Sequence, residues 1–349
     1  MNAENRPLVS VIIPVFNAEK FLHQCISSVT RQSLRDIQII LVNDGSSDDS
    51  KSICDYFASI DFRICVFHID NKGVSNARNI GIKNARSEFI MFLDADDWID
   101  LNTCQLAYDF AKEHKLDIVF WSWQKVSIKG IEKETYLEKN SAMLVENNVA
   151  KLRIRSIGLQ GNELSDPTKT DAFNTPWAKL YSRALIVDSN IFFIERKKVG
   201  MEDVLFNIEI FRKANRVSYI PAYLNFYRLD NPDSLSKVDT HSFYAKLKNL
   251  ASAIENLNLD KEAREALNNR KIVSLINVVL SLTNPRAKSS IIEKWTDMNS
   301  VLRETEKRVE WDKFPFQFLP IHWKLFFLLA KWKRTTMLFV MVYVIRLVR

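Results

Sequence analysis

Three aspartates, Asp94, Asp96 and Asp97, lie within four consecutive positions, with Ala95 between the first two, directly after the apolar run Phe89–Leu93. Neighbouring carboxylates repel one another, so such a cluster needs a cation or several hydrogen-bond donors nearby. Mg²⁺ and Mn²⁺ take oxygen ligands and are commonly held between one or two carboxylates and the phosphates of a substrate. The cluster therefore predicts a metal and phosphate site. A solvated acidic loop that caps the next helix is the plainer alternative.

A second carboxylate, Asp44, follows another apolar run, Ile37–Val42. Gly45 comes next and permits a tight turn behind the carboxylate. A carboxylate in this position can accept a hydrogen bond from the N–H group of a nucleobase. A turn followed by a helix cap explains the same residues, so the segment alone leaves both interpretations open.

The segment 71–79 (NKGVSNARN) follows a third apolar run and opens a helix. It combines the backbone N–H groups of a helix start with the side chains of Asn71, Lys72 and Arg78. A helix N-terminus with an arginine nearby suits a phosphate group. The segment predicts a phosphate-binding loop, with a solvated helix start as the alternative.

Two adjacent carboxylates, Glu202 and Asp203, open the apolar segment Val204–Ile210. A carboxylate held in a cleft can take a proton from an acceptor hydroxyl group. Acidic residues are also favourable at a helix start because of the helix dipole. The pair is therefore a candidate general base or a plain helix cap.

Strand-like and helix-like segments alternate through the first third of the chain. This alternation predicts βαβ units and a mostly parallel sheet with flanking helices. Ligands of such sheets bind beyond the carboxyl ends of the strands, where the acidic and phosphate-suited segments occur. The predicted strands are Val9–Val15, Ile37–Val42, Ile64–Ile69, Phe89–Leu93 and Ile118–Trp123, and the predicted helices are Ala18–Arg31, Asp48–Ile60 and Val74–Ala85.

The rest of the chain divides by its pattern. Residues 124–170 lack clear periodicity and are interpreted as a loop and a helix over the site, whereas the segment from Thr240 to Arg303 is helical in pattern. The predicted organisation is a catalytic domain at 1–230, a helical region at 231–312 and a tail at 313–349.

The tail carries the net positive charge of the chain. It contains seven basic residues and no acidic residue, so it accounts for the whole formal net charge of +7. Its longest uncharged stretch near the end, Thr335–Ile345, is too short for a spanning helix, which needs about 20 residues. Aromatic residues with interspersed lysines predict a helix on an anionic membrane surface. A helix docked on the protein's own core, or a dimer contact, is the alternative. The aromatic residues are Trp323, Phe326, Phe327 and Trp332.

The amino-acid composition narrows the class of protein to which the chain can belong. The chain has 349 residues, of which 47% are hydrophobic and 26% charged, which is a globular composition. Its four cysteines form no CxxC pair and are interpreted as reduced core residues. The N-terminal segment lacks the pattern of a signal peptide, so a cytosolic protein is expected.

Taken together and in order, these motifs resemble glycosyltransferase family 2, over about residues 7–230. Each motif is weak alone, whereas the combination is specific. The resemblance implies a bacterial inverting glycosyltransferase with the GT-A fold, followed here by a helical C-terminal region. The motifs are Pro14–Asn17, Asn43–Ser46, Asn71-x-Gly73, Ala77–Asn79, Asp94-x-Asp96-Asp97, Thr175–Tyr181 and Glu202-Asp203.

The resemblance assigns the nucleotide side of the site. Pro14 and Phe16 would border the base, and Asp44 would bind it, commonly as uracil. Asn71 and Arg78 would lie near the nucleotide and its diphosphate. Phe16 stands where the family often has tyrosine, so a hydroxyl group is lost but the ring can still stack on a base.

The resemblance also assigns the reacting side. Asp94 and Ala95 would contact the ribose region, and Asp96 would bind the Mn²⁺ or Mg²⁺ ion through which the diphosphate is held. Asp203 would be the general base, with Glu202 as its neighbour. An inverting transfer needs such a base and a stabilised leaving group, and it needs no covalent nucleophile.

The implied function is transfer of a hexose or N-acetylhexosamine from a nucleotide sugar, with UDP as the expected nucleotide, to a glycan or lipid-linked acceptor. Such transfer would serve the synthesis of cell-surface polysaccharide or lipopolysaccharide. With the tail, the resemblance implies a cytoplasmic enzyme on the inner face of the cell membrane.

Three other functions fit less well. A sugar-phosphate nucleotidyltransferase typically has a glycine-rich loop after its first strand, and the segment 14–21 (PVFNAEKF) has no glycine. A silent nucleotide- or glycan-binding protein would lack Asp96 or Asp203, and both are present. A nucleic-acid partner is not expected, because the basic residues interleave with an apolar tail.

Overall fold

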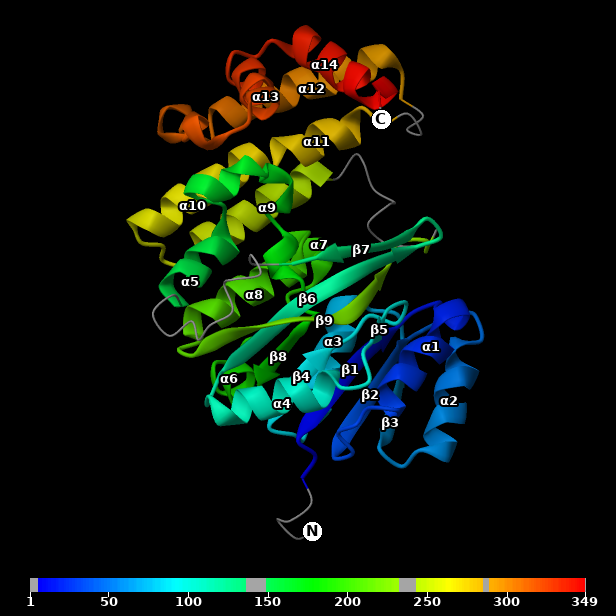
Figure 1. Cartoon of the computed structure of the whole chain (residues 1–349). Coiled ribbons are helices and arrows are strands. Elements are labelled where there is room, and N and C mark those ends of the chain that lie inside the picture. The colour runs from blue at the N-terminus through cyan, green and yellow to red at the C-terminus, as the bar shows by residue number, and fades with distance from the viewer. Residues whose placement is uncertain (1–5, 136–148, 232–242, 285–288, 349) are drawn as a thin grey trace. The chain divides into compact units, whose positions relative to one another are not determined.

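The computed structural model describes residues 6–135, 149–231, 243–284 and 289–348, and Figure 1 shows its helices and strands. The chain forms two compact units. Unit 1 combines Met1–Leu152, Asn174–Arg196 and Glu202–Asp233, and unit 2 combines Arg153–Phe173, Lys197–Met201 and Ser234–Arg349.

These units differ from the three parts predicted from the sequence. Residues 153–173 belong to unit 2 rather than to the N-terminal part, and residues 313–349 are part of unit 2 rather than a separate tail. The physical reason is apolar burial, because Leu159, Leu164 and Phe327 all lie in one buried cluster of unit 2.

Four parallel strands form the first half of the sheet in unit 1, in the order β3, β2, β1, β4. All residues of β2 are buried, as expected for parallel strands covered by crossover helices. The predicted bounds of these strands and of the three helices between them are confirmed to within two residues. The elements are β1 (Val9–Val15), α1 (Glu19–Thr30), β2 (Ile37–Asp44), α2 (Ser50–Ile60), β3 (Ile64–Ile69), α3 (Val74–Asn84) and β4 (Phe89–Phe92).

The second half of the sheet is mixed. Strand β8 lies antiparallel between β4 and β6, whereas β6 and β9 are parallel. Strand β5 is antiparallel to β9, and β7 is antiparallel to β6. The sheet is therefore mixed, and the predicted parallel pairing holds for the first four strands and for β6 with β9. The strands of this half are β5 (Trp98–Ile99), β6 (Ile118–Ser127), β7 (Gly130–Glu134), β8 (Lys179–Ser182) and β9 (Val217–Arg228).

The interpretation of 124–170 as a loop and a helix is wrong at its start. Strand β6 continues to Ser127 and turns into β7, because the chain pairs with itself across a short turn. Residues 136–148 lie outside the described part of the chain. The remaining elements up to residue 233 are α4 (Thr103–Glu113), α5 (Val149–Ile157), α6 (Arg183–Asp188), α7 (Arg196–Val199), α8 (Glu202–Lys213) and short 3₁₀ turns at Gly161–Ser165, Pro167–Lys169 and Ala172–Asn174.

A close approach holds α3 against β1. A Cβ atom added at Gly81 would lie 2.3 Å from the Cγ2 atom of Ile12, a distance that only glycine avoids. The helix can therefore pack directly on the strand. This packing leaves Arg78 buried on α3, so the close contact of Gly81 with the Ile12 side chain helps to fix a side chain of the candidate site.

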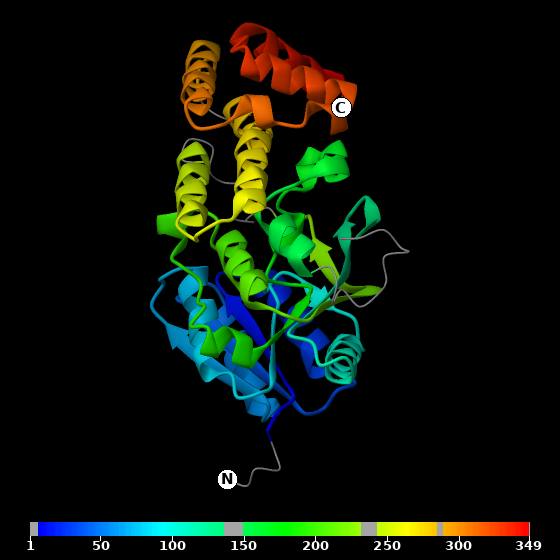
Figure 2. The same cartoon turned by 90° about the vertical axis from the view of Figure 1, so that its left-hand side faces the viewer.

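Unit 2 is helical, which confirms the pattern predicted from Thr240 to Arg303 for the described residues. Helix α12 begins with a capping box between Ser290 and Glu293, and Asp260 caps α10; such caps satisfy the free N–H groups of a first turn. Helices α12, α13 and α14 contact one another (Figure 2). The helices are α9 (Phe243–Glu255), α10 (Lys261–Val273), α11 (Leu275–Leu282), α12 (Ile291–Glu306), α13 (Ile321–Lys331) and α14 (Thr335–Val348), with 3₁₀ turns at Trp311–Lys313 and Phe316–Phe318.

The tail packs on the core of its own unit. Phe326 and Phe327 are 2% and 0% exposed, and both belong to the buried cluster of unit 2. The expectation that these two rings face a membrane is therefore wrong, because they complete the protein's own apolar core. No helix among the described residues is long and apolar enough to cross a membrane.

The cysteines agree with the prediction. All four are free thiols, and Cys25, Cys54 and Cys104 are buried. Burial raises the pKa of the Cys104 thiol to about 12, so this sulfur stays protonated and unreactive at neutral pH.

Candidate active site

The carboxylate of Asp44 ends β2 and fastens the loop that follows β3. Its two oxygens accept hydrogen bonds from the backbone N–H groups of Lys72 and Gly73, both at 2.8 Å. Gly45 allows the approach, since its φ is +69° and a Cβ atom there would lie 2.8 Å from the nitrogen of Asn71. Asp44 thus has a structural partner that the sequence did not indicate, and its contact with a base stays a prediction.

The loops after β1 and β2 lie side by side. The Asn17 side-chain oxygen accepts a hydrogen bond from the backbone N–H of Ser47 at 2.9 Å, and the Asn17 N–H donates to the hydroxyl of Ser46 at 3.0 Å. Phe16, next to this junction, has 48% of its surface exposed, whereas Pro14 is half-buried within β1. An exposed ring at the end of the parallel strands can stack on a flat base.

A buried arginine joins three segments of unit 1. The Arg78 guanidinium lies 3.0 Å from an Asp94 oxygen and 2.5 Å from an Asp203 oxygen. A Glu202 oxygen lies 3.8 Å away, and the guanidinium carbon lies 5.2 Å from the centre of the Phe193 ring. The structure thus brings together residues that the sequence separates by as many as 125 positions.

The charges of this cluster shift its pKa values. Burial by itself lowers the pKa of Arg78. The negative charges of Asp203, Asp94 and Glu202 have the larger effect and raise the arginine pKa. Although 34% of the Asp203 side chain is exposed, enough protein surrounds it for desolvation to be the largest influence on its pKa. Burial, helped by Glu202 and Asp94 and opposed by Arg78, raises the pKa of Asp203 to about 7. A carboxylate with a pKa near neutrality is suited to general-base work.

The three aspartates after β4 face different partners. Asp94 binds Arg78, and Asp96 accepts a hydrogen bond from the Asn231 amide at 2.7 Å. Asp97 is 2% exposed and accepts from the Arg228 N–H at 2.8 Å. Asp97 therefore ties the acidic loop to β9, whereas Asp94 and Asp96 remain half-buried.

A single carboxylate of this loop fits a divalent cation. Among the described residues, no group of three or more His, Cys, Asp or Glu side chains is arranged as a metal site. Burial and the neighbouring Asp94 raise the pKa of Asp96. The groups around Asp96 therefore do not fully offset the negative charge of its carboxylate. A cation held by Asp96 together with substrate phosphates would offset the rest of that charge, which is the common arrangement for Mg²⁺.

Several partners in the site escaped the sequence analysis. Asn231 and Arg228 carry no recognisable signal, because their contacts with the acidic loop arise only when the end of β9 and the residues after it fold against that loop. Lys179 is fully buried, and its ammonium donates to the Thr175 carbonyl at 2.7 Å. Burial lowers the Lys179 pKa, and Asp203 opposes that shift. The run Thr175–Tyr181 was a usable signal for this lysine.

A sequence model described as "Glycosyl transferase family 2" matches residues 10–188 of the chain. The uncharacterized glycosyltransferase EpsJ of Bacillus subtilis is 38% identical over 66% of this chain. Glycosyltransferase GlyA of Streptococcus pneumoniae is 30% identical over 67% of it. The alignments span only 64% of EpsJ and 32% of GlyA.

The fold has a close counterpart among solved structures. The crystal structure of Staphylococcus aureus TarS 1–349 in complex with UDP-GlcNAc superposes with a TM-score of 0.71, covering 98% of this chain and 92% of that chain at 21% identity. TarS is a poly(ribitol-phosphate) β-N-acetylglucosaminyltransferase, and its sequence aligns at 25% identity over 74% of this chain and 42% of its own. The likeness at this identity establishes the shared fold.

Proposed function

Since the chain belongs to glycosyl transferase family 2, we propose that it transfers a sugar from a nucleotide-sugar donor to a hydroxyl group of a glycan or lipid-linked acceptor, with inversion at the sugar. One observation carries this proposal. Asp203, with a pKa of about 7, shares the buried Arg78 guanidinium with Asp94 of the acidic loop. The Asp203 carboxylate, a proton acceptor, is thus in contact with the Arg78 guanidinium, a group suited to a diphosphate.

The proposed reaction is a single displacement. Asp203 takes the proton of the acceptor hydroxyl group while the hydroxyl oxygen attacks the anomeric carbon of the donor sugar. The bond from that carbon to the diphosphate oxygen breaks. The leaving diphosphate keeps the electron pair of the broken bond. Glu202 is 4% exposed, and its negative charge helps to keep the Asp203 pKa high enough to accept a proton.

The leaving group meets positive charge in this proposal. The Arg78 guanidinium is held by Asp94 and Asp203, and its positive charge would stabilise the negative charge that develops on the diphosphate. Asp96 would hold a Mn²⁺ or Mg²⁺ ion, which offsets charge on the departing diphosphate. Asn231 orients Asp96 through its amide.

We expect the donor to be a UDP-sugar. The TarS relative forms complexes with UDP-GlcNAc and UDP, and the resemblance to the family assigns Asp44 and Phe16 to the base. Because a ligand of the native state stabilises it by about 2.7 kcal/mol at 100 times its Kd, UDP with Mn²⁺ should raise the thermal midpoint. GDP and CDP should raise it less. A stronger effect of GDP would assign a different nucleotide.

The aromatic ring at position 16 offers a direct test of base binding. Phe16→Ala should weaken UDP binding by about 1–3 kcal/mol, the usual contribution of an aromatic ring stacked on a base. The ring is exposed, so the stability of the free protein should barely change. Calorimetric titration with UDP measures the effect. Phe62→Ala is the matched control, since Phe62 is 96% exposed and precedes the amino end of β3 rather than following the carboxyl end of a strand. Equal affinities of wild type and Phe16→Ala would remove Phe16 from the site.

We expect the acceptor to be a cell-surface polymer or its lipid-linked precursor. TarS acts on poly(ribitol-phosphate), as its name states, and membership of one family supports an acceptor of the same broad class. A membrane-bound acceptor would explain an enzyme that binds a lipid surface.

The structure changes the basis of the proposed membrane contact. Lys331 and Lys333 form ion pairs with Asp312 and Glu306, and Lys313 pairs with Glu310. Less of the tail's positive charge is therefore available to lipid than its sequence suggests. Apolar side chains remain exposed at helical spacing, namely Ile321 and Leu325 on α13, and Met337, Val340 and Val344 on α14.

The variant Met337→Ser/Val340→Ser/Val344→Ser tests this contact. Wild-type protein should sediment with anionic vesicles, and the triple variant should remain in the supernatant because the apolar row of α14 is lost. These side chains are more than half exposed, so the fold should survive. Phe62→Ser controls for loss of any exposed apolar group. Wild-type protein that ignores anionic vesicles at low salt would exclude the membrane role.

A further inference from the structure

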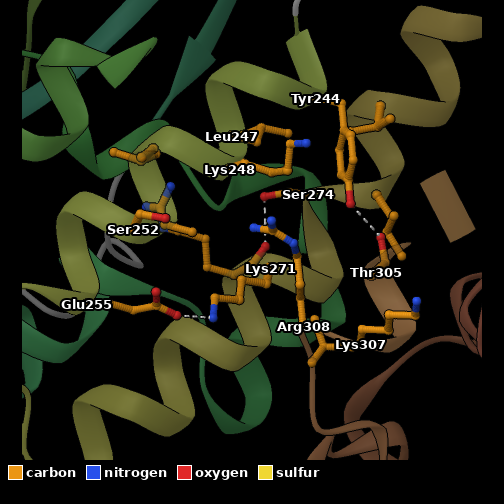
Figure 3. A pocket seen from close by; sticks show the side chains of 16 residues that line it. Tyr244, Leu247, Lys248, Ser252, Glu255, Lys271, Ser274, Thr305, Lys307 and Arg308 are labelled. Carbon is orange, nitrogen blue, oxygen red and sulfur yellow. Dashed lines mark hydrogen bonds and ion pairs between the residues drawn. The ribbon is translucent and has the colours of Figure 1, made fainter. Parts of the chain in front are cut away.

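Unit 2 contains a cavity of about 310 Å³ whose lining includes no residue of the candidate active site. Its walls come from α9, from the junction of α10 and α11, and from the end of α12 with the turn that follows (Figure 3). Leu250, Leu275 and Val278 give it buried apolar surface. Its volume lies at the lower end of the range for small-molecule sites, which is about 300–1,000 Å³.

Two of the five basic side chains that line the cavity are neutralised by nearby acids. Lys271 forms an ion pair with Glu255. Arg270 forms one with Asp171, and its other nitrogens donate to the carbonyls of Ile157 and Ser156. These two cations stabilise the helices of unit 2 and are not available to a ligand.

The other three basic side chains leave an excess of positive charge. Glu304 is shared between the Lys248 ammonium at 3.0 Å and the Arg308 guanidinium at 3.3 Å. Within the described residues, Lys307 forms no ion pair. One carboxylate therefore offsets three positive charges, which leaves an excess of two positive charges among these lining side chains. Figure 3 shows the Arg308 side chain extending among the other lining side chains.

The lining also offers hydroxyl groups. Ser252 and Ser274 line the cavity, and the Ser274 hydroxyl donates to the Arg270 carbonyl while its oxygen can still accept. The Tyr244 ring has the Lys248 ammonium 5.0 Å from its centre, so one face of the ring is covered. These groups suit a hydroxylated body better than a stacked nucleobase.

We propose that this cavity binds a phosphate ester of a sugar or polyol. Such an ester carries about −1.5 to −2 charge at neutral pH, which matches the two uncompensated positive charges. Lys248 and Arg308, which share Glu304, bind the phosphate through charge-assisted hydrogen bonds. Lys307, whose side chain extends away from Arg308 in Figure 3, adds positive charge at the rim. The serine hydroxyls and the apolar wall contact the body of the ligand.

The ligand chemistry has two sources. The ester can be free in solution, in which case the cavity is a regulatory site. It can also be one unit of a phosphate-bearing acceptor polymer, in which case the cavity is a second acceptor subsite; that version rests on the proposed function. A plainer role for Lys307 and Arg308 is to stabilise the carboxyl end of α12 through its dipole.

Calorimetric titration of the full chain with glycerol 3-phosphate tests the proposal, with UDP and Mn²⁺ present in excess to occupy the candidate active site. We expect saturable binding to one site per chain. The variant Lys307→Gln/Arg308→Gln should weaken binding at least tenfold with an unchanged thermal midpoint. Arg303→Gln is the matched control, because this exposed arginine lies on α12 outside the cavity lining.

Absence of binding, or equal binding by the double variant and the wild type, would overturn the proposal. A lower thermal midpoint in the double variant without any change in binding would assign the two cations to the helix end instead. A short glycerol-phosphate oligomer separates the two sources: tighter binding than the monomer identifies a polymer, and equal binding identifies a free ester. Failure of UDP to bind would count against the transferase proposal only, since the dependence on Lys307 and Arg308 is still measured.

Discussion

Replacing Asp203 by asparagine is expected to reduce turnover by about 10²–10⁴-fold, the usual contribution of a general base. Asparagine keeps the shape of the side chain and one oxygen to accept from Arg78, but it cannot take a proton from the acceptor. Arg78 also keeps its contacts with Asp94 and Glu202, so the fold and the affinity for UDP should be nearly unchanged. Release of nucleoside diphosphate at saturating donor measures the loss.

The pH profile provides an independent check. The pKa of Asp203 is raised to about 7, and only its ionised form can act as a base. The wild-type kcat/KM should therefore increase as the pH is raised through about 7 and decrease as the pH is lowered through that value. The Asp203→Asn variant should lose this limb. Glu209→Gln, on the same helix, is the matched control. An Asp203→Asn variant with near wild-type turnover would exclude Asp203 as the base.

The second large effect is expected for Asp96→Asn. The amide can still accept a hydrogen bond from Asn231, but it removes the negative charge that would hold a divalent cation. Because a metal ion contributes several kcal/mol to stabilising a leaving diphosphate, turnover should fall by at least about 10²-fold. Calorimetry should show that Mn²⁺ no longer strengthens UDP binding.

Asp100→Asn is the matched control for Asp96. Asp100 lies four positions further along and accepts a backbone hydrogen bond from Asn102 at 2.9 Å, which asparagine can also accept. Its substitution should leave both turnover and metal dependence unchanged. Full wild-type activity in excess EDTA would contradict the metal assignment even if Asp96→Asn were inactive.

The parallel half of the sheet could be predicted because its strands are buried. A fully buried strand such as β2 appears in the sequence as a continuous apolar run, and its ends were placed to within two residues. Strand β8 (Lys179–Ser182) carries no such signal. It has four residues, two of them polar, and its antiparallel place between β4 and β6 depends on tertiary pairing alone.

The candidate site was predictable as a set of residues but not as a network. Each carboxylate could be found at a strand end or helix start, whereas the Arg78 bridge from Asp94 to Asp203 exists only after folding. Asn231 lay beyond sequence reasoning for the same reason. In the tail, aromatic residues with interspersed lysines predicted a surface helix, but the sequence pattern does not say whether protein or lipid covers its apolar face.

The buried cluster of unit 2 also has a consequence for synthesis of the chain. It joins Leu159 and Leu164 to Leu338 and Val342, so its first and last members leave the ribosome far apart in time. Unit 1 is complete in sequence at Asp233, whereas unit 2 must wait until Val342 emerges. At elongation rates of about 5–20 residues per second, this interval lasts roughly 5–20 s. During that time the early apolar residues of unit 2 lack their partners, and they are the natural targets for a chaperone acting on the nascent chain.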